Sequence, residues 1–130
     1  MQAFTFIDDT KKVLDAAHRA TVRALKVAGY AIFRTAQQSI QTSPKPSAPG
    51  EPPHSRRGLL RRAERYEVDD QAETAVIGPR FALVGTSAEA HEFGGQYKRE
   101  TFQARPSIGP ALQQNVSKLP AYFSGQVTSE

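Results

Sequence analysis

The chain of 130 residues contains no cysteine and no tryptophan, and only 8% of its residues are aromatic. Without cysteine it forms no disulfide, has no thiolate nucleophile and offers no sulfur ligand to a metal. Hydrophobic residues make up only 38% of the sequence. A domain of this size buries only about two-thirds of its unfolded surface. We therefore expect a single domain that completes its core by contact with other subunits.

Long apolar runs are also missing. Charged residues interrupt the sequence too often for a membrane-spanning helix. Residues 1–7 lack the basic start and apolar centre of a signal peptide. We therefore expect no membrane partner, and we expect the chain to fold in a cytosol.

Clusters that indicate catalysis or metal binding are missing as well. The three histidines, at 18, 54 and 91, have neither the helical nor the finger spacing of zinc ligands. His91 and Glu92 are adjacent, and adjacent side chains on a helix point in different directions. The paired glycines that follow lack the lysine and helix start of a phosphate-binding loop. We expect no enzyme activity, no cofactor and no metal.

What is present begins with a long helical pattern over residues 1–42. Asp8, Asp9 and Thr10 are candidate N-caps, and no proline occurs from there to Gln41. Apolar residues recur at steps of three and four, at Val13, Ala17, Ala20, Ala24, Val27 and Ala31. At 1.5 Å per residue the helix reaches roughly 50 Å, more than a small domain requires. We expect part of this stripe to pack on a neighbouring copy and part on the chain's own sheet.

Residues 43–57 form a proline-rich arm. Five of the nine prolines lie here, at positions 44, 46, 49, 52 and 53. Such a segment is extended and cannot join a central strand. Long loops without secondary structure are usually functional or disordered. We expect the arm to reach an adjacent subunit, and a flexible connector is the alternative.

Residues 58–119 carry the remaining secondary structure, and residues 120–130 form a tail. Alternation and turn residues predict strands from Tyr66, over 74–78, over 80–85 and over 98–104. Helices are predicted over 87–93 and 107–118, and the tail is expected to be frayed or bound to a partner. The fold class is α+β, with a long N-terminal helix and a C-terminal helix packed on a small antiparallel sheet of about four strands.

An arginine cluster precedes the first predicted strand. It consists of Arg56, Arg57, Arg61, Arg62 and Arg65. Clustered arginines bind phosphates, but the sparse aromatic residues around them argue against base stacking. Residues 43–65 hold six basic and two acidic residues, whereas residues 66–130 hold five basic and eight acidic ones. The cluster therefore suits docking against the acidic half of another copy, contact with a DNA backbone, or a solvated surface.

Four short strings then follow one another between residues 50 and 112. They are GLLRR at 58–62, AVIGP at 75–79, HEFGG at 91–95 and ARPSIGPAL at 104–112. Their order and spacing resemble the neck and tail-completion proteins of tailed bacteriophages. The chain departs from that pattern at Ser107, where the family usually has an aromatic residue, and at Ala63, where it tends to have serine.

The resemblance implies a structural virion protein, assembled in the cytoplasm of a bacterial host. Such proteins form homo-oligomeric rings, of six- or twelve-fold symmetry, at the neck between head and tail. The expected partners are the head connector or adaptor and the tail terminator or tail tube, with non-specific contact to DNA in the channel. The alternative is a small basic DNA-binding accessory protein.

Two groups of residues are expected to matter in such a ring. The first makes subunit or partner contacts and consists of Leu59, Leu60, Arg61, Arg62 and Arg65. The second forms the turn that shapes the end of the sheet and consists of Phe93, Gly94, Gly95, Arg105 and Pro106. The resemblance implies no catalytic, cofactor-binding or metal-binding residue.

Overall fold

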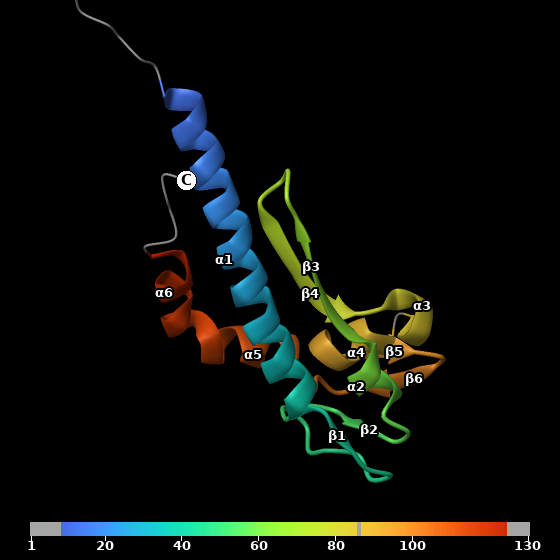
Figure 1. Cartoon of the computed structure of the whole chain (residues 1–130). Helices are drawn as coiled ribbons and strands as arrows, with labels where there is room; N and C mark the ends of the chain where they lie inside the picture. Colours follow the sequence, from blue (N-terminus) through green and yellow to red (C-terminus); the bar gives the residue numbers. More distant parts are fainter. Residues whose placement is uncertain (1–8, 86, 125–130) are drawn as a thin grey trace, which may run out of the picture.

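The computed structural model of the chain describes residues 9–85 and 87–124. A single long helix, α1 (Thr10–Ser39), runs along the molecule, and its N-terminal end projects beyond the other elements (Figure 1). A β-hairpin lies on one side of α1, and the C-terminal helices lie on the other. The predicted α+β class, with N- and C-terminal helices packed on small sheets, is confirmed.

The buried face of α1 is built mostly from alanine. Its buried side chains recur every four residues, at Ala16, Ala20, Ala24, Ala28, Ile32 and Ala36. Because alanine is small, the elements on both sides approach the helix closely. The predicted stripe is right at Ala20 and Ala24, but Val13 and Val27 are 59% and 51% exposed. The prediction assumed that α1 buries one face. Instead α1 packs between two layers, and the side chains that lie between these layers are exposed to solvent.

The hairpin consists of β3 (Glu64–Asp69) and β4 (Thr74–Pro79), paired antiparallel from Glu64↔Pro79 to Asp69↔Thr74. At its turn, Asp69 Oδ1 accepts hydrogen bonds from the backbone N–H groups of residues 71 and 72, as expected for a turn-forming aspartate. Tyr66 packs its ring against those of Tyr30 and Phe33 on α1. The hairpin is thereby fixed to the long helix.

The strands form three two-stranded sheets rather than one sheet of about four strands. Besides the hairpin, β1 (Gln41–Thr42) pairs in parallel with β2 (His54–Ser55). Strand β5 (Gly95–Tyr97) pairs antiparallel with β6 (Glu100–Phe102), so the strand expected over 98–104 is shorter and has a neighbour that the sequence pattern did not predict.

The strand expected over 80–85 is wrong, because this segment contains the short helix α3 (Phe81–Val84). The Arg80 carbonyl accepts the backbone N–H groups of Leu83 and Val84, which closes a helical turn. Gly85 follows with a φ of +59°, the left-handed conformation that commonly ends a helix. The turn immediately after β4 carries the chain away from the hairpin.

The other helices are short. They are α2 (Leu59–Ala63), α4 (Ser87–Phe93), α5 (Ile108–Asn115), a 3-10 turn at Val116–Lys118 and α6 (Leu119–Phe123). The helices predicted over 87–93 and 107–118 are therefore confirmed. The tail expected from residue 120 is helical as far as Phe123, and residues 125–130 lie outside the described part of the chain.

The proline-rich arm folds back on its own chain. Its ends pair as β1 and β2, and Gly50 donates a backbone hydrogen bond of 2.9 Å to the Ala104 carbonyl. Arg105 Nε donates to the Ser47 carbonyl at 2.9 Å, and Ser47 is buried. The expectation of a loop without secondary structure is therefore wrong for these residues, because their backbone groups pair within the chain. Contact between the arm's exposed residues and a neighbour stays a prediction.

Candidate functional site

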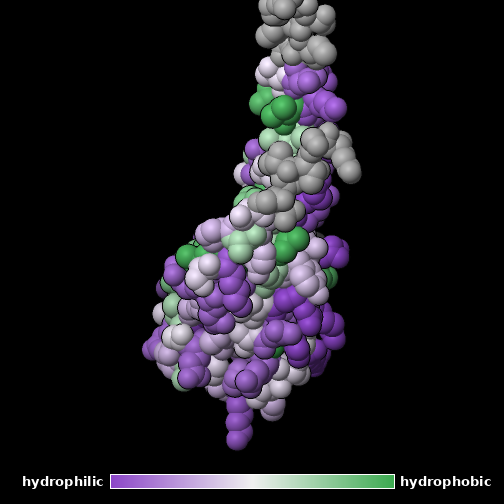
Figure 2. Space-filling view, turned by 60° about the vertical axis from the view of Figure 1, so that its left-hand side comes forward, coloured by the Kyte–Doolittle hydropathy of each residue, from purple (hydrophilic) through white to green (hydrophobic). Residues whose placement is uncertain are grey.

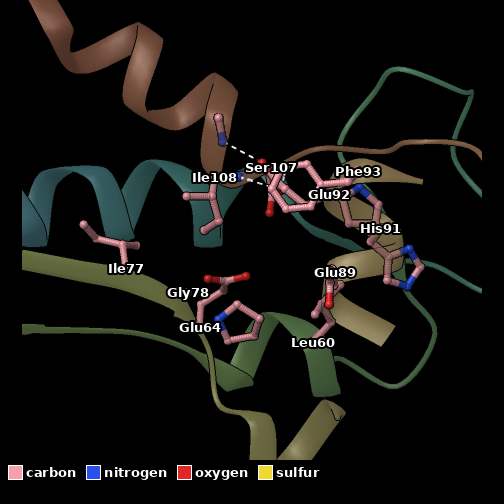
Figure 3. A pocket seen from close by; sticks show the side chains of 13 residues that line it. Leu60, Glu64, Ile77, Gly78, Glu89, His91, Glu92, Phe93, Ser107 and Ile108 are labelled. Carbon is pink, nitrogen blue, oxygen red and sulfur yellow. Dashed lines mark hydrogen bonds between the residues drawn. The ribbon is translucent and has the colours of Figure 1, made fainter. Parts of the chain in front are cut away.

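The strings HEFGG and ARPSIGPAL are joined through one side chain. The carboxylate of Glu92, at the end of α4, accepts backbone hydrogen bonds from the first residues of α5: Oε2 from Ser107 at 2.9 Å and from Ile108 at 3.2 Å, Oε1 from Gly109 at 2.7 Å. The first N–H groups of a helix have no partner within it, and they favour a negative charge. Glu92 therefore caps α5 from a separate helix (Figure 3).

The predicted turn residues only partly come together. Gly94 has a φ of +76°, and a Cβ at this position would lie 3.2 Å from both the Phe102 oxygen and the Ala104 nitrogen. The backbone N–H of Arg105 donates to the His91 carbonyl at 2.6 Å. Gly94 and Arg105 thus shape the junction between α4 and the start of α5. Phe93 does not take part, since its side chain is 79% exposed.

Gly95 and Pro106 flank this junction. Gly95 begins β5 with a φ of +123° and has open space around its Cα. Pro106 is half-buried and immediately precedes Ser107, the N-cap residue of α5. Both positions suit a turn, in agreement with the expectation, and neither shows a contact that indicates ligand binding.

A pocket of about 400 Å³ opens beside the junction, between Pro53, α2, the start of β3, the end of β4, α4 and the start of α5. Its apolar lining comes from Leu60, Ile77, Pro79, Phe93 and Ile108. Its acidic lining comes from Glu64, Glu89 and Glu92. Leu60 and Phe93, one from each predicted group, both line this pocket, and the other members of the two groups do not.

Glu64 is the unusual residue of the pocket. Its side chain is only 3% exposed, and within the described structure its Oε2 has no hydrogen-bond partner. Figure 3 shows its carboxyl group pointing into the space between Ile77 and Ile108. Burial, assisted by the nearby charge of Glu92, raises the pKa of Glu64 from 4.5 to about 7. A carboxyl group in this setting is ready to accept a hydrogen-bond donor or a cation.

His91 lies on the wall of the same pocket. Burial and, secondarily, the positive charge of Arg105 lower its pKa, so its imidazole is held neutral. Its ring packs edge-on against Phe102, with 5.7 Å between ring centroids. Its buried Nδ1 has no hydrogen-bond partner within the described structure. The aromatic contact indicates a packing role.

The arginine cluster lies on the surface near the pocket. The side chains at positions 56, 57, 61, 62 and 65 are all exposed. Leu59 is 43% exposed, whereas Leu60 is half-buried and lines the pocket. The backbone before α2 is fixed by Gly58, with a φ of +73°, and by Ser55 Oγ, which accepts the Leu60 N–H. These contacts hold the start of α2, and Arg61 and Arg62 on this short helix are exposed to solvent.

Sequence reasoning missed Glu64 and the capping role of Glu92. Glu64 begins a strand of alternating character, and nothing in the local pattern marks it as buried. For Glu92 the sequence did contain a signal of capping. This acidic residue stands just before two glycines, and a proline stands just before the next long predicted helix. Only the three-dimensional structure shows that the two segments meet.

Within residues 9–85 and 87–124, no group of three or more histidine, aspartate or glutamate side chains could hold a metal ion. In the same ranges no helix is both long and apolar enough to cross a membrane. No protein-family model, curated protein or solved structure matches the chain.

Proposed function

We propose that the protein is a structural component of a tailed-phage virion. It is a subunit of a homo-oligomeric ring at the neck, which completes the tail and joins it to the head connector. The observation that carries this proposal is the capping of α5 by Glu92. It links two of the four strings on which the resemblance to neck proteins depends, so those strings form one structural unit.

The surface supports an assembly role. Large apolar side chains are exposed on several elements, including Val13 and Leu14 on α1, Val76 on β4 and Phe93 on α4. Figure 2 shows hydrophobic groups beside strongly hydrophilic ones on the projecting part of the molecule. Scattered apolar residues are normal on any surface. Here they occur on a chain with few hydrophobic residues, and contact with neighbouring copies would bury them.

The arginine cluster provides the charged part of the proposed contacts. Arg61 and Arg62 on α2 and Arg65 on β3 are exposed to solvent, and Leu59 lies on the same short helix. In a ring they dock against the acidic residues of the next copy, and electrostatic complementarity sets the orientation of docking. A ring around a DNA channel also allows some of them to contact phosphates without reading sequence.

Electron microscopy of phage particles tests the proposal. Particles assembled without this protein are expected to appear as separate filled heads and tails, and adding the purified protein is expected to restore joined particles. A normal yield of joined particles in its absence would refute the proposal. Tight, sequence-selective DNA binding by the purified chain would instead favour the alternative of a DNA-binding accessory protein.

A further inference from the structure

The pocket around Glu64 calls for a particular kind of occupant. Its walls are apolar, and its polar groups include the three carboxyl groups of Glu64, Glu89 and Glu92. A buried carboxyl group without a donor is unfavourable, because it is removed from water and gains no hydrogen bond in return. A cation on an apolar stem satisfies both features of the pocket, since the stem contacts the walls and the charge meets Glu64.

The groups that face Glu64 exclude an anionic occupant. The titratable residues of the lining are Glu89, His91 and Glu92 on α4, and the described lining residues from α2, β4 and α5 are not titratable. With His91 held neutral, the ionisable groups that remain in the lining are carboxyl groups, while Arg105 places a positive charge near His91. An amine or guanidinium group is therefore attracted, and a phosphate or carboxylate is repelled.

A matching surface lies at the other end of the same molecule. The first turns of α1, residues 11–14, which we call the α1 tip, project away from the elements that line the pocket (Figure 1). Val13 and Leu14 are 59% and 63% exposed there, and Lys12 is exposed beside them. Lys11 is also exposed and pairs with Asp15. The tip thus combines apolar side chains with a lysine.

We propose that the α1 tip of one copy seats in the Glu64 pocket of the next copy. Lys12 then donates its ammonium group to Glu64, while the neighbouring exposed side chain of Val13 covers the apolar walls. This inference rests on the self-assembly proposed above and names the contact that produces it. Because the tip and the pocket lie at opposite ends, the contact is head-to-tail, and such contacts repeat into a closed ring when the rotation between copies permits.

Two variants test the α1 tip and the Glu64 pocket separately. Val13→Glu places a negative charge beside Lys12 at an exposed position of the tip. Glu64→Gln removes the carboxyl group that meets Lys12, preserves the shape of the pocket and leaves Glu89 and Glu92 in place. Each purified variant is expected to associate at least about tenfold more weakly than the wild type. Glu64→Gln loses a charge-assisted hydrogen bond, and Val13→Glu brings a carboxylate to an acidic pocket. Mass photometry over a concentration series measures this, and circular dichroism checks that each variant is folded. Lys12→Arg should assemble normally, and Lys12→Glu should not.

Mixing the variants gives the decisive result. A Glu64→Gln copy retains a working tip and a Val13→Glu copy retains a working pocket, so the mixture should form pairs that neither variant forms alone. If both variants assemble like the wild type, or if the mixture forms no pairs, the tip-to-pocket contact is wrong while the ring itself stands. If the wild type is monomeric at every concentration, both the proposed contact and the proposed ring are wrong.

Discussion

The side chain of Glu92 and the backbone N–H of Gly109 form a 2.7 Å hydrogen bond that ties the end of α4 to the first turn of α5. Two further N–H groups donate to the same carboxylate. We predict that Glu92→Ala lowers the free energy of unfolding by about 2 kcal/mol, because it leaves three helix N–H groups without their charged acceptor. Urea denaturation measures the change.

A matched control for that variant is available on the same helix. Glu89 is exposed, so Glu89→Ala should change the free energy of unfolding by less than about 0.5 kcal/mol. Equal effects of the two substitutions would show that the capping interaction contributes nothing beyond a general change of charge on α4.

Gly94 provides a second test of the same junction. At its φ of +76°, a Cβ would be strained and would also press on the backbone of residues 102 and 104. We expect Gly94→Ala to lower the free energy of unfolding by roughly 2 kcal/mol or more. Gly50 has a similar φ of +84° but nothing within 4 Å, so Gly50→Ala should cost clearly less. Thermal unfolding of both variants measures the two effects: Gly50→Ala reports the cost of the positive φ alone, and Gly94→Ala adds the cost of the close backbone contact.

Glu64 should make stability depend on pH. Its pKa is about 7 in the folded chain and 4.5 as the ordinary value, so the folded state holds the proton more tightly. The contribution of Glu64 to the free energy of unfolding should therefore be greatest below pH 4.5. It should decrease by about 3 kcal/mol as the pH rises through 7.

His91 acts in the opposite direction below pH 6.5, because its pKa is lowered in the folded chain. The effect of Glu64 alone is therefore given by the difference in the free energy of unfolding between the wild type and Glu64→Gln. Urea denaturation from pH 4 to pH 8 measures it. That difference should change between about pH 4.5 and pH 7 and level off on either side of this interval. A constant difference would mean that Glu64 keeps an ordinary pKa.

Reversing the charge of the exposed turn tests the arginine cluster. We predict that Arg61→Glu combined with Arg62→Glu prevents head–tail joining and leaves the fold intact, because both side chains face solvent. Circular dichroism and a joining assay scored by electron microscopy provide the two readouts. Arg80→Glu, also exposed but outside the cluster, serves as the control. Normal joining by the double variant would remove Arg61 and Arg62 from the contact surface.

Local patterns in the sequence predicted α1, α4, α5 and the hairpin well, because each depends on neighbouring residues. The periodicity before Gln41 and the turn at Asp69 are examples. The segment after Pro79 was predicted wrongly because its apolar residues suit a strand as well as a helix, and Gly85 decides between them. The pairing of the proline-rich arm and the burial of Glu64 depend on distant contacts, which no local pattern encodes.

The mass of the purified chain in solution tests the central claim most directly. Sedimentation velocity at physiological salt, repeated over a range of concentrations, should show a species of six or twelve times the chain mass of 14.2 kDa. High salt should shift it toward smaller species, since charged contacts contribute to docking. A chain that sediments at 14.2 kDa under all these conditions would contradict the account.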